Sequence, residues 1–183
     1  MVVATAAVSA AGAVAVSVPF IASWMPSERA KVSGAPVRFD PSKLEPGRQI
    51  TLEWHSKPVF VLRRTTEILQ AMDQPSHLQK LRDPDSRVDT QQPAYAANPF
   101  RSIRDEFFIV IGICTHLGCI PTFRPEVAPE DLGTEWIGGY FCPCHSSKFD
   151  LAGRVFKGVP APTNLVVPPY RYLSGTSIEI GVG

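Results

Sequence analysis

Two hexapeptides, CTHLGC at residues 114–119 and CPCHSS at residues 142–147, hold all four cysteines of this 183-residue chain and two of its four histidines. Each hexapeptide therefore brings two cysteines and one histidine to one short segment. Apolar runs precede both, EFFIVIGI at residues 106–113 and EWIGGYF at residues 135–141. Such runs predict buried strands, so we expect two β-loops to present the hexapeptides.

Three kinds of site fit this pattern of residues. Two disulfides would suit an exported domain but leave the histidines without a role. A structural Cys2His2 zinc site usually draws on pairs two to four residues apart, whereas the first loop offers the tighter pair Cys114-x-His116. In the third arrangement, each loop gives one thiolate and one imidazole to a metal centre and one cysteine to a disulfide between the loops. This arrangement uses all six residues.

The rest of the chain from Val37 onward predicts a mainly antiparallel β domain. QITLEW (residues 49–54) alternates polar and apolar residues, and PVFVL (residues 58–62) is apolar. A short turn separates the two segments, which is typical of a hairpin. TTEILQAM, with Thr65 as its N-cap, predicts one short helix. Residues 73–100 are polar and carry prolines, so we expect a long surface excursion there. Further strands are expected at GRVFK (153–157), NLVV (164–167), YRYL (170–173) and SIEIGV (177–182).

The N-terminal segment has no charged residue before residue 28. As a helix from Val2 to Trp24 it would be roughly 34 Å long, about the thickness of a hydrocarbon core. A cleaved signal peptide is the alternative, but it needs a basic start and a shorter apolar run. We therefore expect a transmembrane anchor at residues 1–24, a flexible hinge at residues 25–36 and a head domain at residues 37–183.

The charge of the chain bears on its partners. The formal net charge is +1, and Lys and Arg form no cluster that could bind phosphates. We therefore expect no nucleic-acid partner.

The pattern C-x-H … C-x-x-H, with roughly 25 residues between its halves, resembles the Rieske iron–sulfur family, in which two histidines replace two cysteines on one iron of a 2Fe–2S cluster. Rieske ferredoxins and ring-hydroxylating oxygenases generally lack the second cysteine of each hexapeptide, whereas quinol-oxidising complexes have it. The resemblance is therefore to the Rieske proteins of quinol-oxidising complexes. Nearly the whole chain is similar to the iron–sulfur subunit of proteobacterial quinol–cytochrome c reductases. The similarity includes the segments FRPEVAP (123–129) and FDLAGRVFKGVPAPTNL (149–165), the anchor and the hinge. No twin-arginine motif precedes the anchor, although the family commonly has one.

The resemblance implies a role for each residue of the two hexapeptides. It implies that Cys114 and Cys142 bind the inner iron, that His116 and His145 bind the outer iron, and that Cys119 and Cys144 form a disulfide. His145 would be the catalytic residue, since the second histidine meets the quinol in the family. The Ser147 hydroxyl would donate to a bridging sulfide, and Leu117 would belong to an apolar docking tip or simply pack its loop.

Three further positions follow from the same resemblance. GVPAP (158–162) looks like the proline-rich loop that shields the cluster, within a cluster-binding subdomain at about residues 107–163. Ser146 stands where the family often has glycine. Phe149 stands where members of high potential usually have a tyrosine that donates a hydrogen bond to the first cysteine ligand.

The two histidines suit the redox chemistry that the resemblance implies. With neutral imidazoles in place of two thiolates the oxidised cluster carries no net charge, so it accepts an electron easily, at roughly −150 to +300 mV. A ligand imidazole on ferric iron loses its outer proton readily and regains it on reduction, so the electron and the proton are coupled.

The expected function is therefore that of the electron-transfer subunit of a respiratory quinol–cytochrome c reductase. It would hold one Rieske 2Fe–2S cluster and work with quinol, a b-type cytochrome and a c-type cytochrome in a dimeric complex. The chain would be a single-pass protein of the bacterial inner membrane with its head on the periplasmic side, because the disulfide needs an oxidising compartment. The alternative is the small Rieske subunit of a periplasmic oxidase such as arsenite oxidase.

Overall fold

The structure, a computed structural model, describes residues 2–27, 34–174 and 177–182. The chain divides into two compact units, residues 1–35 and residues 36–183. The hinge expected at residues 25–36 lies in part outside the described residues, because these omit residues 28–33.

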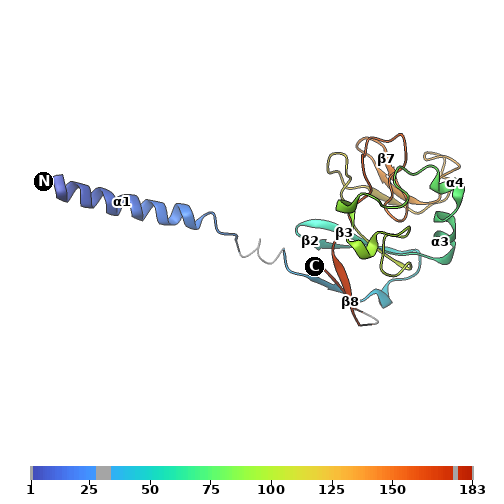
Figure 1. Cartoon of the computed structure of the whole chain (residues 1–183), viewed down its shortest axis with the longest axis horizontal. Helices are drawn as coiled ribbons and strands as arrows, with labels where there is room; N and C mark the ends of the chain where they lie inside the picture. Colours follow the sequence, from blue (N-terminus) through green and yellow to red (C-terminus); the bar gives the residue numbers. More distant parts are fainter. Residues whose placement is uncertain (1, 28–33, 175–176, 183) are drawn as a thin grey trace. The chain divides into compact units, whose positions relative to one another are not determined.

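The first unit contains the helix α1 (Val2–Ala22) (Figure 1). It has no acidic residue in its first turn and no basic residue in its last turn, and Pro19 lies inside it. Among the described residues, α1 is the one helix long and apolar enough to cross a membrane. The prediction of an apolar N-terminal helix of this length is confirmed.

The second unit is a β domain of three small sheets in which every strand pair is antiparallel. The sheets have the strand orders β1-β9-β8, β2-β3-β4 and β5-β6-β7. The strands are β1 (Val37–Phe39), β2 (Gln49–Trp54), β3 (Lys57–Arg63), β4 (Phe107–Ile111), β5 (Thr122–Arg124), β6 (Gly139–Cys142), β7 (Ser147–Phe149), β8 (Tyr170–Ser174) and β9 (Ser177–Ile180). Within this unit, β7 and β8 lie at opposite ends (Figure 1). The predicted mainly antiparallel β fold is confirmed.

The hairpin of β2 and β3 forms as predicted. Its turn is the dipeptide His55–Ser56, and both residues are left-handed, with φ of 51° and 56°. Two left-handed residues are what a two-residue hairpin loop requires, because they match the twist of the flanking strands. β3 is the middle strand of its sheet, and its side chains from Val59 to Leu62 are buried on both faces.

Short helices lie between β3 and β4. α3 (Thr66–Met72) begins where predicted, since the side chain of Thr65 accepts a hydrogen bond from the Ile68 amide. α4 (Pro75–Leu78) follows directly, and 3-10 turns lie at Asp89–Gln91 and Ala94–Ala96, while another 3-10 turn, Pro41–Lys43, lies between β1 and β2.

The expected surface excursion at residues 73–100 is wrong in part. His77, Leu81 and Ala96 are almost fully buried, and Leu81 forms a bridge with Phe156. Polar composition misled the prediction, because a polar side chain can be buried where it finds a charged partner, as His77 does with Asp150.

Two of the expected strands do not form among the described residues. Residues 153–157 make only isolated bridges, and residues 164–167 make none. The backbone bonds of the second segment go to separate partners: the Leu165 amide donates to Gly153, the Val166 carbonyl accepts from Ile111, and the Val167 amide donates to Gln91. A ladder needs successive bonds to one strand, so no strand results.

Candidate metal centre

The first hexapeptide begins three residues after β4, where the chain turns back on itself. The Gly118 amide donates to the Cys114 carbonyl (3.0 Å), and the Cys114 amide donates to the Cys119 carbonyl (2.7 Å). Gly118 has a φ of 83°, a left-handed conformation that glycine adopts without steric cost. The turn leaves Cys114 buried beneath it.

The second hexapeptide joins β6 to β7 with nearly the same geometry. The Ser146 amide donates to the Cys142 carbonyl (2.9 Å), again from the fifth residue to the first, and Ser146 is left-handed with a φ of 60°. This conformation explains why glycine suits the position. A serine can hold it, but at some steric cost. Cys142 pairs directly with Ser147 across the two strands.

The four cysteines divide into two pairs. Cys119 and Cys144 form a disulfide with Cα atoms 6.6 Å apart, whereas Cys114 and Cys142 are free and buried. The sulfur atoms of Cys119, Cys142 and Cys144 lie within 4.8 Å of one another, so the disulfide runs directly beside a free thiol. Because two of these three sulfurs are bonded to each other, only Cys142 of the three can offer a thiolate.

The histidines of the hexapeptides lie side by side at the surface. The ring centroids of His116 and His145 are 4.7 Å apart with the ring planes at 88°, and His145 is exposed. The other two histidines belong elsewhere: His55 lies in the β2–β3 turn, and His77 contacts Asp150. The two loops therefore offer two buried thiols and, further out, two imidazoles, which is the donor set of a Rieske-type 2Fe–2S cluster.

Burial affects the free thiol of Cys114. It is the main reason that the pKa of Cys114 is raised, and the adjacent Cys142 raises it further. A thiol of this kind becomes a thiolate when it binds a metal, and the released proton leaves the site.

Two hydroxyl groups tie the loops to the proline-bearing segment. Ser147 is fully buried, and its Oγ accepts a hydrogen bond from the Ala161 amide (3.0 Å) while the same side chain bonds to Cys114. The Thr115 hydroxyl donates to the Thr163 carbonyl (2.7 Å). Sequence reasoning missed Thr115, whereas Ala161 lies in the GVPAP segment that the resemblance had implied as a cover for the cluster, and the two hydrogen bonds hold this segment against the loops.

The first loop also carries exposed apolar side chains next to His116 in the sequence. Leu117 is 71% exposed, so it does not pack its own loop, and its neighbour Ile120 is 56% exposed. Sequence reasoning missed Ile120, although an apolar residue directly after the hexapeptide was a usable signal. Exposed apolar residues that gather around a site often mark a contact surface.

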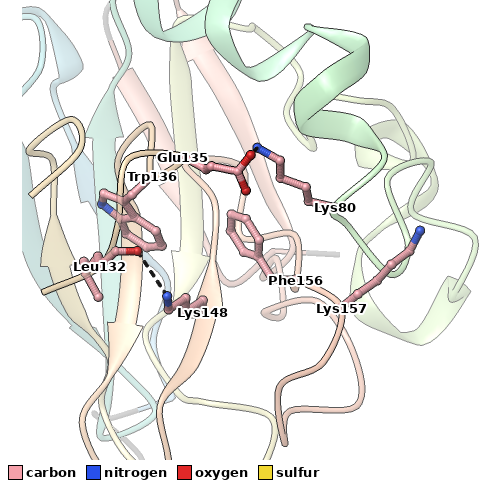
Figure 2. Close-up of a pocket in the computed structure, with 7 residues that line it drawn as sticks. All are labelled: Lys80, Leu132, Glu135, Trp136, Lys148, Phe156 and Lys157. Carbon is pink, nitrogen blue, oxygen red and sulfur yellow. Dashed lines mark hydrogen bonds and ion pairs between the residues drawn. The ribbon is translucent and has the colours of Figure 1, made fainter. Parts of the chain in front are cut away.

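A pocket of about 320 Å³ lies apart from this centre (Figure 2). Its three lysines all have partners: Lys80 pairs with Glu135 (3.2 Å), Lys148 donates to the Leu132 carbonyl (3.3 Å) and Lys157 donates to the Gln79 carbonyl (2.7 Å). Neighbouring residues of a strand point to opposite faces, so Lys148 faces away from Ser147. The pocket is lined by Lys80, Leu132, Glu135, Trp136, Lys148, Phe156 and Lys157, and none of these belongs to the metal centre.

The fold and the donor set define the class of protein: the chain belongs to the family of the Rieske [2Fe-2S] domain, whose model matches residues 37–171. Over 99% of its length it is similar to ubiquinol-cytochrome c reductase iron-sulfur subunits. It is 56% identical to that of Allochromatium vinosum, of which it covers 86%, and 40% identical to that of Blastochloris viridis, of which it covers 90%.

A solved structure shares the fold of the chain. A chain of the structure described as "Hyperthermophilic respiratory Complex III" superposes with a TM-score of 0.50 at 23% identity. The match covers 97% of this chain and 98% of that chain.

Proposed function

We propose that this chain is the iron–sulfur subunit of a membrane-bound quinol–cytochrome c reductase, which takes one electron from quinol and passes it to a c-type cytochrome. The observation that carries the proposal is the pairing of two buried free thiols with two neighbouring imidazoles, next to a disulfide, in a chain 56% identical to such a subunit. The fold positions these groups on two loops of matching geometry.

The proposed ligands are those that the family resemblance implies, and the burial of the residues supports them. Cys114 and Cys142 would bind the inner iron, and His116 and His145 would bind the outer iron, since the thiols are buried and His145 is exposed. The cluster supplies a one-electron acceptor whose potential is raised by its two neutral ligands.

His145 would also handle the proton. The ring nitrogen that is not bound to iron is available to a hydrogen bond from the quinol hydroxyl, and it would hold the proton that leaves with the electron. Leu117 and Ile120, both largely exposed, would provide the apolar surface that surrounds the quinol and excludes water where the head meets a b-type cytochrome.

The proposal extends to membrane topology. Residues 1–24 would anchor the chain in the bacterial inner membrane, and the head at residues 37–183 would lie on the periplasmic side, because a disulfide persists in an oxidising compartment. Within the head, residues 107–163 would form the cluster-binding subdomain. The whole complex would be a dimer.

The test of the function is isolation of the intact, tagged chain from membranes, followed by haem spectra. We expect b-type and c-type haem to co-purify with the chain and with a 2Fe–2S electron paramagnetic resonance signal. Co-purification with a molybdenum-containing subunit instead would show that the chain serves a periplasmic oxidase.

The first testable prediction concerns the hinge proposed at residues 25–36. One head must meet two partners, so the linker should allow it to move. A run of prolines at residues 30–34 should lower quinol-dependent reduction of cytochrome c several-fold and leave the cluster spectrum unchanged. Glycine and serine at the same positions are the matched control and should keep turnover. Full turnover with the proline linker would show that the head need not move.

The next prediction concerns Phe149, which is fully buried in β7 two residues beyond Ser147 and therefore on the same face. Because the Ser147 side chain bonds to Cys114, a hydroxyl added to the Phe149 ring would enter the neighbourhood of the same sulfur. A donor aimed at thiolate sulfur stabilises the reduced state more than the oxidised state.

Phe149→Tyr should therefore raise the midpoint potential by tens of millivolts. A charge-assisted hydrogen bond is worth about 1.5–3 kcal/mol, and about 1.4 kcal/mol corresponds to 59 mV for one electron, but only the difference between the two redox states counts. Redox titration measures the shift. Phe141→Tyr is the matched control, because Phe141 pairs with Lys148 and faces away from Ser147. An unchanged or lower potential in Phe149→Tyr would contradict the argument.

A further inference from the structure

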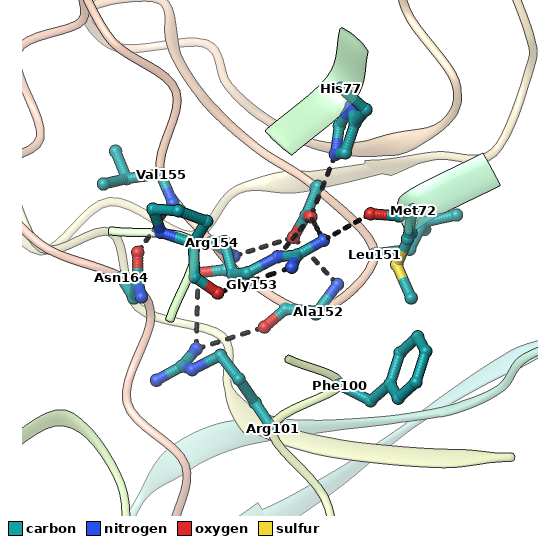
Figure 3. A network of polar contacts seen from close by, with 12 residues as sticks. Met72, His77, Phe100, Arg101, Leu151, Ala152, Gly153, Arg154, Val155 and Asn164 are labelled. Atoms are coloured by element: carbon teal, nitrogen blue, oxygen red, sulfur yellow. Dashed lines mark hydrogen bonds and ion pairs between the residues drawn. The ribbon is translucent and has the colours of Figure 1, made fainter. Parts of the chain in front are cut away.

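A second buried polar cluster lies beyond the end of β7, outside the metal centre. The Asp150 carboxylate is fully buried, and its Oδ1 accepts hydrogen bonds from the amides of Ala152 (2.9 Å) and Arg154 (2.8 Å). Its Oδ2 accepts from Arg154 Nε (2.8 Å) and from His77 Nε2 (3.1 Å). His77 and Arg154, which lie on two different segments in Figure 3, both bond to this carboxylate.

Two more buried arginines hold the turn that follows Asp150. Arg101 donates to the carbonyls of Ala152 (3.1 Å) and Gly153 (3.4 Å) (Figure 3). Arg64 donates to the Leu151 carbonyl (3.5 Å) and to the Phe100 carbonyl (2.8 Å). Both guanidinium groups are therefore bound largely by neutral carbonyl oxygens, which do not cancel their charge, and among the described residues the buried Arg101 Nε has no hydrogen-bond partner.

The charges of this cluster do not balance. Burial lowers the pKa of Arg64 and of Arg101 to about 10, so both remain charged at neutral pH. Burial alone would raise the pKa of Asp150, but the charge of Arg154 and the hydrogen bonds of His77 and Arg154 lower it well below its usual range. The buried part of the cluster therefore holds three guanidinium groups and one carboxylate, and the further acids that act on Arg101 and Arg64, Asp83 and Asp105, lie nearer the solvent.

Asp150, at the heart of the cluster, is close to the metal centre along the chain. Asp150 is three residues beyond Ser147, and a strand advances about 3.3 Å per residue, so the two Cα atoms are about 10 Å apart. The side chains of Phe149 and Tyr140, which pair across β7 and β6, are fully buried and belong to the same core as Cys114, Cys142 and Leu151. Charges in such surroundings are screened much less than charges at the surface.

We propose that the buried arginines Arg64, Arg101 and Arg154, only partly balanced by Asp150, raise the midpoint potential of the iron–sulfur centre through their net positive field. Reduction adds one negative charge to the centre, and a positive field at short range stabilises that charge. The inference rests on the centre proposed above. It also gives residues 73–106 a role, because this segment supplies Arg101 and the His77 that holds Asp150 in place.

The test is redox titration of the full-length chain with its cluster, followed by electron paramagnetic resonance. Arg101→Gln removes a positive charge and should lower the midpoint potential, whereas Asp150→Asn removes a negative charge and should raise it. Arg101→Lys keeps the charge and should restore most of the original potential. The matched control is Arg87→Gln, which removes an arginine whose side chain is 82% exposed and should change nothing.

The opposite signs separate a field effect from loosened packing, which has no reason to follow the sign of the lost charge. Shifts of Arg101→Gln and Asp150→Asn in the same direction would overturn the proposal, and so would an unchanged potential in Arg101→Gln or a failure of Arg101→Lys to restore it. If Asp150→Asn does not fold, the two Arg101 variants decide the matter. A native chain without any 2Fe–2S signal would instead refute the proposed centre.

Discussion

Replacing His145 with alanine should abolish the 2Fe–2S centre, with iron and acid-labile sulfide falling to background. The two loops place only two imidazoles together, those of His116 and His145, with ring centroids 4.7 Å apart. Without His145 the outer iron would keep a single imidazole and would be open to water, and an incomplete ligand set does not hold a cluster. Metal analysis and the electron paramagnetic resonance spectrum of the reduced protein measure the loss.

The matched control is His55→Ala. His55 is exposed in the β2–β3 turn, so this variant removes an imidazole without touching either hexapeptide. It should keep its full iron load, although alanine in a left-handed turn position will cost some stability. A normal iron and sulfide load in His145→Ala would disprove the ligand assignment.

The sequence predicted well those elements whose signals are local. The apolar run before the first hexapeptide becomes β4, the alternating segment at residues 49–54 becomes β2, and the Thr65 cap begins α3. Each of these elements depends on hydrophobic periodicity or on a cap within its own residues, so neighbouring residues suffice to predict it.

Elements that depend on distant partners were harder to predict. β5 and β7 have three residues each, too few for a period to show, and they form because β6 pairs with both. The buried arginines were missed for a related reason. Arg101 looks like an ordinary charged residue in a polar segment, and only the fold brings it to the carbonyls of Ala152 and Gly153.

For the site itself, residue types in a fixed pattern carried most of the information. The six cysteines and histidines could be found from spacing, but three arrangements of them remained open until the resemblance selected one. The sequence alone could not show how deeply each residue of the site is buried. The structure buries Cys114 and Cys142, exposes His145, and covers the loops with residues 158–163 through Ser147 and Thr115.

Loss of the disulfide should have the second large effect. The bond joins residues 25 apart, and closing a loop of that length in the unfolded chain is worth about 3.5 kcal/mol in the chain-entropy model. Cys144→Ser should therefore lower the free energy of unfolding by about 2–4 kcal/mol. Cluster assembly should be poorer, and the midpoint potential of the remaining centre should be lower, because the exposed second loop is less firmly held.

A double variant makes this prediction sharper. Cys144→Ser alone leaves the Cys119 thiol within 4.8 Å of the Cys142 sulfur, where it can compete for iron. Cys119→Ser with Cys144→Ser removes both sulfurs, so it should lose about as much stability as either single variant and assemble the cluster better than Cys144→Ser. Urea unfolding and iron analysis of Cys119→Ser, Cys144→Ser and the double variant test this. Two cysteines joined by one bond contribute a single stabilising free energy, which either substitution removes. If the stability losses of the two single variants add up in the double variant, the two cysteines act independently. That result would contradict a disulfide between them.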